Sequence, residues 1–379
     1  MGTTVTARSM KVFRLAVPAA AMVAGLLLTG SVGASGSPPS TATPPSHIGG
    51  TPMFTTNSWG LPGPTKAAAV ATLPHWASSF SLGGKTYHYT MVGTNPTGNH
   101  ATALPTEILP ITLTFSSGPP LTSTTQTTAL KSSPIFKPTA FTSGTTQFGD
   151  AMQRAEFWNV VSTTSTNYHV RLGKPTVLPT VTINIPAADG TEYYYSPLST
   201  YYAYVDYTYF TTQLAAVISA ANFDPKTLPL IISSNVFLYT GTTSNCCVYG
   251  YHGSYATSTT RNTYAYANFL TDGLSSTPGA GDIYTFSHEV AEWMNDPFVN
   301  NSVPRWIQPG TGTCFSSLLE VGDPVEALNP PGYSIAEGGV KWNPTDVAGL
   351  SWFTHASPST EQNGLYSYDG KLTSSNTNC

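Results

Sequence analysis

The segment Ser287-His288-Glu289-Val290-Ala291-Glu292-Trp293-Met294-Asn295-Asp296-Pro297 decides how this chain folds. Asp282 precedes the segment as a candidate N-cap and Pro297 ends its pattern, so we predict a helix of about four turns. His288 and Glu292 stand four residues apart, so a helix projects both from one side and both can bind one cation. Glu289 lies between them, where a carboxylate can take a proton from a metal-bound water.

This spacing is that of the zinc-binding HExxH helix, with glutamate in the place of the second histidine. The two faces of the predicted helix differ in chemistry. One arc is apolar and holds Ile283, Phe286, Val290, Trp293 and Met294. The opposite arc holds Thr285, His288, Glu289, Glu292 and Asp296. A solvated surface helix shows the same division, but this polar face has no Lys or Arg, which favours a metal site.

The first 34 residues predict a secretory signal peptide. Three basic residues precede the apolar run Leu15–Leu28, and Val32-Gly33-Ala34 offers a small-residue cleavage site. No later apolar run is long enough to cross a bilayer. We therefore predict a secreted, periplasmic or extracellular protein with no membrane anchor after signal removal.

The charge balance excludes several classes of partner. Of 15 Lys and Arg residues three lie in the predicted signal, which leaves 12 against 19 Asp and Glu, a net charge of −7. An acidic chain without a basic cluster argues against nucleic acid and anionic membranes as partners. Charged residues make up only 9% of the chain, so we expect stability to depend little on pH.

The four cysteines are predicted to form disulfides, because oxidised pairs are usual in an exported chain. They are Cys246, Cys247, Cys314 and Cys379. Adjacent cysteines rarely bond to each other. We therefore expect Cys246 and Cys247 to pair with Cys314 and Cys379, in an order that spacing does not assign.

The chain predicts a mixed α+β fold. Residues 35–50 are rich in Pro, Ser and Thr, which predicts a disordered linker. Residues 51–140 predict an irregular β-rich N-terminal region that is a folded module or a removable pro-segment, and residues 141–379 predict the α+β domain. Its expected helices are 146–160, 201–222 and the segment quoted above, and its expected strands are 168–172, 177–185, 228–239 and the edge strand 263–270.

A catalytic zinc needs a third protein ligand from outside the helix. Leu319-Glu320-Val321-Gly322-Asp323-Pro324-Val325-Glu326 holds three acids around a glycine. Asp323 or Glu320 is our candidate, with a simple Asp-Pro turn as the alternative. Asp296 is better explained as a turn residue at the helix end.

Three further residues are weaker candidates for an oxyanion or substrate role. His252 follows the cysteine pair and is either a ligand, an oxyanion donor or a hydrogen-bonded loop histidine. His355 and Tyr366 lie where a late loop can face a cleft, and Tyr or His often stabilises the oxyanion in metal hydrolysis. Packing roles are the alternative for both.

Residues 286–323 resemble zincin-type metallopeptidases, and more narrowly a group of exported bacterial proteins with an SHExxE…DP…EVGD signature. The matching residues are Ser287–Glu292, Asp296-Pro297, Trp306 and Glu320–Asp323. The paired cysteines and Tyr251-His252-Gly253 also resemble that group.

The resemblance implies a zincin-like mixed sheet whose edge strand, here 263–270, pairs with an extended peptide. By position His288 matches the first zinc ligand and Glu289 the general base. Glu292 stands where zincins carry the second histidine, and Asp323 or Glu320 takes the place of the downstream acidic ligand. The extra carboxylate makes the metal a poorer Lewis acid and also admits Ca²⁺ or Mn²⁺ in place of Zn²⁺.

Two functions follow as hypotheses. The first is an exported metallopeptidase that acts on an extracellular peptide or protein, with Glu289 as general base. The second is a secreted binding or structural protein on the same scaffold, with a structural ion or none.

Overall fold

The computed structural model describes residues 53–58, 71–315 and 317–379. The predicted signal peptide and linker, residues 1–34 and 35–50, lie outside the described residues. The described residues all belong to one compact unit. The division expected at residue 140 does not separate two units, because strand β5 (Thr106–Thr114) lies inside the main sheet between β10 and β13.

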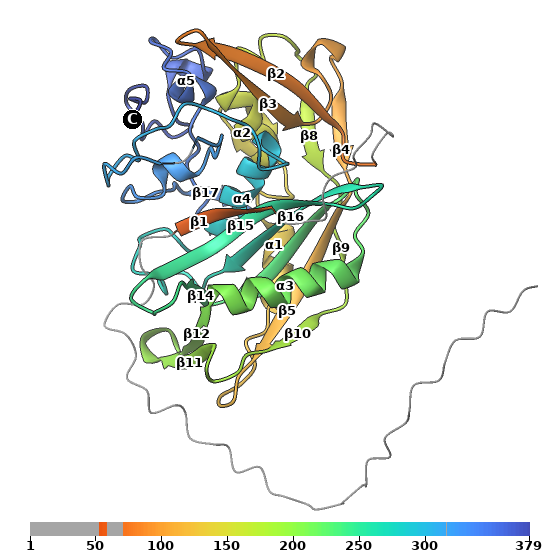
Figure 1. The fold of residues 1–379 in the computed structure, drawn as a ribbon, viewed down its shortest axis with the longest axis vertical. Coiled ribbons are helices and arrows are strands. Elements are labelled where there is room, and N and C mark those ends of the chain that lie inside the picture. Colours follow the sequence, from red (N-terminus) through yellow and green to blue (C-terminus); the bar gives the residue numbers. More distant parts are fainter. Residues whose placement is uncertain (1–52, 59–70, 316) are drawn as a thin grey trace, which may run out of the picture. The chain divides into compact units, whose positions relative to one another are not determined.

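A mixed ten-stranded sheet forms the centre of the described residues (Figure 1). Its strand order is β10-β5-β13-β16-β15-β14-β12-β11, while β1 and β9 pair off this path with β15 and β5. The strands not yet bounded are β1 (Met53–Ser58), β9 (Thr176–Val177), β10 (Val181–Asn184), β11 (Gly190–Tyr195), β12 (Thr200–Asp206), β13 (Leu228–Ser234), β14 (Val236–Tyr239), β15 (Cys246–Ala256) and β16 (Arg261–Phe269).

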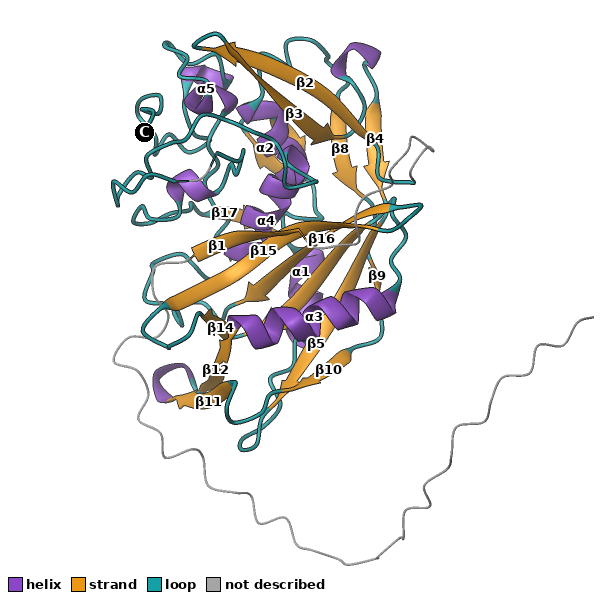
Figure 2. Cartoon of the chain, viewed as in Figure 1, coloured by secondary structure: helices purple, strands orange, loops and turns teal. Residues whose placement is uncertain are grey.

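Smaller strand pairs and helices surround this sheet (Figure 2). The pairs are β2 (His75–Leu82) with β3 (Lys85–Val92), β4 (Ala101–Leu104) with β8 (His169–Leu172), β6 (Thr139–Phe141) with β7 (Gly144–Thr146), and β17 (Ile335–Glu337) with β18 (Val340–Trp342). The helices are α1 (Thr124–Ser132), α2 (Phe148–Glu156), α3 (Tyr207–Ala221), α4 (Tyr284–Asn295) and α5 (Leu350–Phe353). None of the described helices is long and apolar enough to span a membrane.

Alternating side chains of β13 and β16 divide the core between the two faces of the sheet. Leu230, Ile232, Ala265 and Ala267 belong to the cluster that contains the apolar residues of α2 and α4. Ile231, Tyr264 and Tyr266 belong to the cluster that contains the buried residues of α3. The sheet is therefore a middle layer between α3 on one face and α2 with α4 on the other (Figure 1).

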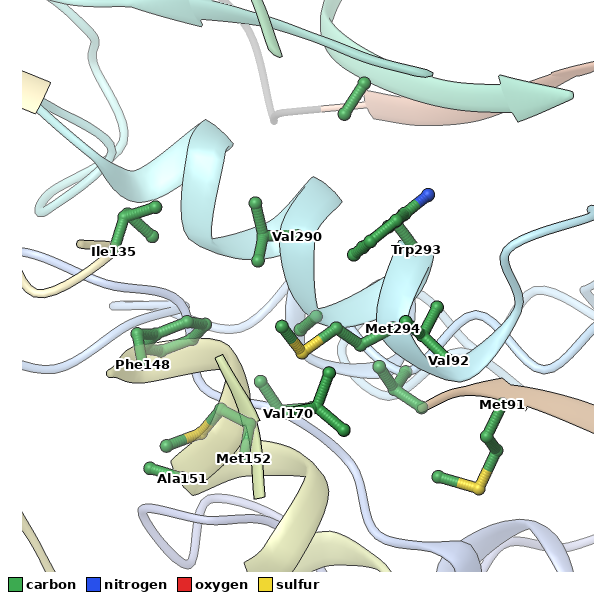
Figure 3. Close-up of a cluster of buried hydrophobic side chains, with 14 of the residues drawn as sticks. Met91, Val92, Ile135, Phe148, Ala151, Met152, Val170, Val290, Trp293 and Met294 are labelled. Atoms are coloured by element: carbon green, nitrogen blue, oxygen red, sulfur yellow. The ribbon is translucent and has the colours of Figure 1, made fainter. Parts of the chain in front are cut away.

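Helix α4 is enclosed on every side, since all twelve of its residues are buried. Val290 and Met294 face α2, whereas Trp293 points toward the sheet (Figure 3). Gly149 of α2 permits this approach, because a Cβ there would lie 2.6 Å from Cε of Met294. Trp293 Nε1 donates to Thr263 Oγ1 on β16 at 2.8 Å. The complete burial rules out the solvated surface helix.

Several predicted elements differ in extent or kind. Residues 201–206, expected as the start of a helix, belong to β12, because a run of aromatic and β-branched residues pairs in the sheet before α3 begins. The strand expected over 228–239 is two strands, β13 and β14, separated by Asn235 at a φ of 55°. The helix expected at 146–160 is shorter, and the strand expected at 177–185 is divided into β9 and β10.

The strand expected at the sheet edge is central instead. β16 pairs in parallel with β13 on one side and antiparallel with β15 on the other. Its alternation of tyrosine with alanine comes from two different buried faces, not from one solvated face. A peptide therefore has no free edge on β16 with which to pair.

The disulfides also differ from the prediction. Cys246 pairs with Cys247, and Cys314 pairs with Cys379. Backbone bridges between Trp306 and Asn378 and between Ile307 and Cys314 hold the C-terminus beside the 306–314 loop. Cys314 and Cys379 therefore meet each other, and the adjacent cysteines are left as partners.

Candidate metal centre

Two histidines and six acidic residues come together between α4, β15 and the segment Glu320–Glu326. They are His252, His288, Glu289, Glu292, Asp296, Glu320, Asp323 and Glu326, and none is more than 5% exposed. Buried charges must be paired with other charges or bind a cation, because removing them from water is costly. The cluster itself contains no Lys or Arg.

His288 and Glu292 meet as the helical spacing predicts. His288 Nε2 lies 2.9 Å from Glu292 Oε1 and 3.5 Å from Asp323 Oδ1. Glu292 Oε1 also accepts from the backbone N–H groups of Gly322 and Asp323, at 3.1 and 3.3 Å. The helix and the downstream acidic segment are thus joined through one carboxylate.

Gly322 is required for this junction. A Cβ at Gly322 would lie 2.6 Å from Cε1 and Nδ1 of His288. The glycine has ordinary right-handed backbone angles, φ −85° and ψ −32°. Its role is therefore the close approach of the segment to the imidazole ring, and not a special backbone conformation.

His252 contacts the same helix from the sheet. It lies on β15 and not in a loop, with Nδ1 3.4 Å from Glu289 Oε2 and 3.5 Å from Glu292 Oε2. Its Nε2 lies 3.2 Å from the Asp296 carbonyl oxygen and 3.8 Å from Glu320 Oε2. Gly250 lets α4 approach β15, because a Cβ there would lie 2.8 Å from Glu289 Oε1.

The ligand atoms form two compact groups. One consists of His288, Glu289 and Glu292, and the other of His252, Glu292 and Glu320, with all donor atoms of a group within 4.8 Å of one another. Glu292 belongs to both groups. Asp323 lies beside His288 but belongs to neither group.

The pKa values follow from burial and from the two imidazoles. Burial raises the pKa of Glu289 to about 7, against a lowering effect of His252. Burial also raises the pKa of Glu320 well above its usual value. Burial opposes ionisation of Glu292 as well, but attraction to His288 and His252 outweighs it and lowers the pKa of Glu292.

The pKa values of the two histidines, His252 and His288, are raised although burial acts to lower them. Burial alone would lower their pKa values, but nearby carboxylates raise them well above the usual value, chiefly Glu320 for His252 and Glu292 for His288. The carboxylates that face the two imidazoles therefore favour the protonated form of each.

Tyr366 and His355 have partners outside this cluster, and Asp296 also acts as a turn residue. Tyr366 donates its hydroxyl to the Ala356 carbonyl at 3.0 Å, and His355 Nε2 lies 3.5 Å from Asn376 Nδ2. Asp296 accepts from the backbone N–H groups of Asn300 and Asn301, which is the turn role expected for it. None of these residues contributes to the chemistry that we propose.

No family model, curated protein or solved structure matches this chain. Its function must therefore be inferred from the geometry of the cluster.

Proposed function

We propose that this chain is an exported, zincin-like metal-dependent hydrolase that cleaves peptides, with Glu289 as the general base. The observation that carries the proposal is the burial of His288, Glu289 and Glu292 on one turn of α4, against an acidic segment hydrogen-bonded to Glu292. A helix of this kind, packed on a mixed sheet, is the arrangement that the zincin resemblance implies.

The residues present fit a divalent cation. Both oxygens of Glu320 are buried without a hydrogen-bond partner among the described residues. A cation offsets the cost of ionising such carboxylates in a buried site. The ligand set that we propose is His288, Glu292 and one acid of the downstream segment, Asp323 or Glu320.

Zinc is the ion that this donor set favours. Calcium takes oxygen ligands, whereas imidazole nitrogen suits zinc and other transition metals. His252, which contacts Glu292 as His288 does, makes the cluster richer in nitrogen than the helix motif alone. Manganese or calcium remains a measurable alternative outcome.

A bound zinc ion supplies Lewis acidity, which polarises a carbonyl group and acidifies a water molecule. Glu289 has a pKa of about 7, because its carboxyl is buried. At neutral pH it can therefore take a proton on a carboxylate oxygen and return it to a leaving amine. His252 Nδ1, 3.4 Å from Glu289 Oε2, orients that carboxylate.

A non-catalytic binding or structural protein is the second candidate. The observation in its favour is the same burial of the cluster. Hydrolysis requires a peptide carbonyl to reach the cluster, and buried side chains restrict that access. Glu292 in place of histidine also leaves a bound metal less acidic.

Metal content and peptide cleavage distinguish the two functions. We expect the purified full chain to contain about one zinc ion. Glu289→Gln should keep the ion and lose cleavage of a casein or peptide substrate by about 10²–10⁴-fold, the usual range for a lost general base. Glu292→Ala should lose the ion, and the half-buried Glu337→Gln of β17 is a matched control that should change neither.

The outcomes separate as follows. A chain that binds no transition metal and cleaves nothing contradicts the hydrolase. A wild-type chain that binds metal but cleaves nothing supports the structural alternative. Unchanged metal content in Glu292→Ala shows that the ligand assignment is wrong, whatever the activity.

A further inference from the structure

We propose that β1 is a displaceable strand on the edge of β15, beside the cluster of histidines and acids. Once β1 has left, an extended peptide binds along this edge. The peptide-binding half of this inference rests on the proposed function. The displacement of β1 does not.

The pairing of β15 shows why this edge depends on β1. β16 covers one edge of β15 over residues 250–256. On the other edge, β14 reaches only Cys246 and Val248, and β1 pairs in parallel from Val248 to Ser254. Without β1, the backbone N–H and C=O groups of residues 250–254 that point away from β16 have no strand partner among the described residues.

This stretch of β15 is also the one that carries the cluster. Thr56 of β1 is in register with His252, and Phe54 is in register with Gly250. Figure 1 shows β1 running along β15. A second chain segment on this edge in place of β1 would therefore lie next to His252, and near Glu289, which His252 contacts.

β1 has fewer strand partners than β15 and β16, which pair on both edges. It pairs with β15 alone, and a parallel pair is slightly less stable per residue than an antiparallel one. α4 is buried on all sides, and the Glu320–Asp323 segment is hydrogen-bonded both to Glu292 and, through Val321, to Ala348. No cysteine precedes Cys246, so no disulfide fixes β1 to the remainder of the chain.

In this proposal, the covalent link between β1 and β2 keeps β1 paired because it holds the strand at a high effective concentration near β15. A tethered segment has an effective concentration of about 1 mM. For a free-strand Kd of about 100 µM, roughly one molecule in eleven is open while the tether is intact. Cutting the tether at low micromolar protein raises the open fraction about tenfold.

The test uses the full chain with a site-specific protease sequence inserted between Ser58 and Ala71. After cutting, we expect the N-terminal fragment to separate on size-exclusion chromatography and amide exchange to increase at residues 250–254. A labelled peptide with the sequence of residues 51–60 should then bind at micromolar to millimolar concentration. The matched control peptide carries prolines for Thr55 and Thr56, which removes strand donors, and should not bind.

Cleavage of a peptide substrate should rise about tenfold on cutting and fall again when the 51–60 peptide is added. If the fragment stays bound at sub-micromolar protein with unchanged exchange at residues 250–254, β1 is an integral strand and the inference is wrong. Equal binding of the proline peptide also contradicts it. Strand exchange without any cleavage, before or after cutting, rejects the proposed peptidase but retains β1 as the displaceable strand.

Discussion

Glu292 is the side chain on which the cluster depends most directly. Its Oε1 contacts His288 and two backbone N–H groups, while its Oε2 lies 3.5 Å from His252. A histidine at this position could not accept from the backbone of Gly322 and Asp323 while also facing His288. Glutamate at this position therefore also holds the downstream segment against the helix.

Gly322→Ala tests whether that close contact matters for the metal. The added Cβ would lie 2.6 Å from the His288 ring, so either the ring or the segment must move. We expect metal affinity to fall about 10–100-fold, as for other changes in the surroundings of metal ligands. We also expect about 1–3 kcal/mol of destabilisation from overpacking. Metal titration and urea unfolding measure the two effects.

Gly98→Ala is the matched control, because its added Cβ also meets a histidine, His100, at 3.1 Å, but on the exposed surface. It should leave metal affinity unchanged. Equal metal affinity in wild type and Gly322→Ala would falsify the assignment of His288 as a ligand.

Sequence spacing predicted the contact of His288 with Glu292, because both lie on one helix. The three acids near Gly322 in the sequence also predicted that an acid such as Asp323 would lie close to His288. Sequence spacing did not predict the three glutamates around His252, because that contact joins β15 to α4 across the tertiary fold. Tyr251-His252-Gly253 alone carries no sign that His252 points at a helix.

At the scale of elements, α4 was predictable for a local reason: Pro297 ends it and its apolar residues follow the helical period. Its start was less clear. Asp282 is not the cap, since the helix begins at Tyr284 and the Asp282 carboxylate accepts from Ile283 and Asn343. β16 was misplaced at an edge because alternation does not distinguish a solvated face from two unlike buried faces.

The two disulfides should differ in their effect on stability. Cys314 and Cys379 are 65 residues apart, so their bond restricts a long loop of the unfolded chain. Replacing both with Ala should cost about 4 kcal/mol by the chain-entropy estimate. The control is the Ala pair at Cys246 and Cys247, which closes no loop and should cost much less. Urea unfolding under oxidising conditions measures both, and equal losses would show that loop closure is not the cause.

At the scale of the whole molecule, the low content of charged residues predicted stability that depends little on pH. The structure changes this expectation, because many of the few acids are buried. Burial raises the pKa of Glu361 to about 7 and that of Asp346 and Asp282 to about 6. At a pH between the unfolded and the folded pKa values of these carboxyls, the folded protein therefore holds protons that the unfolded chain has released.

The sign of the pH dependence follows from this difference. A carboxyl with a raised folded pKa stabilises the fold fully below its unfolded pKa of about 4.5, and this contribution is lost as pH rises toward the folded value. The lowered pKa of Glu292 acts in the opposite sense, but only below about pH 4.5. Between pH 5 and 7.5 the metal-free protein should therefore become less stable as pH rises.

Glu361→Gln isolates one contribution to this slope. Glu361 Oε1 accepts from the Ser351 N–H at 2.9 Å and its Oε2 from the Trp158 N–H at 2.8 Å, in a nearly enclosed position. Glutamine resembles the protonated acid and cannot ionise, so the variant should lose about 1–3 kcal/mol of the difference in unfolding free energy between pH 5 and 7.5. Urea unfolding at the two pH values in EDTA measures this difference, with Glu337→Gln as the control. A wild-type protein that gains stability over this range, or a Glu361→Gln slope equal to that of wild type, would show that burial of these acids does not govern the pH response.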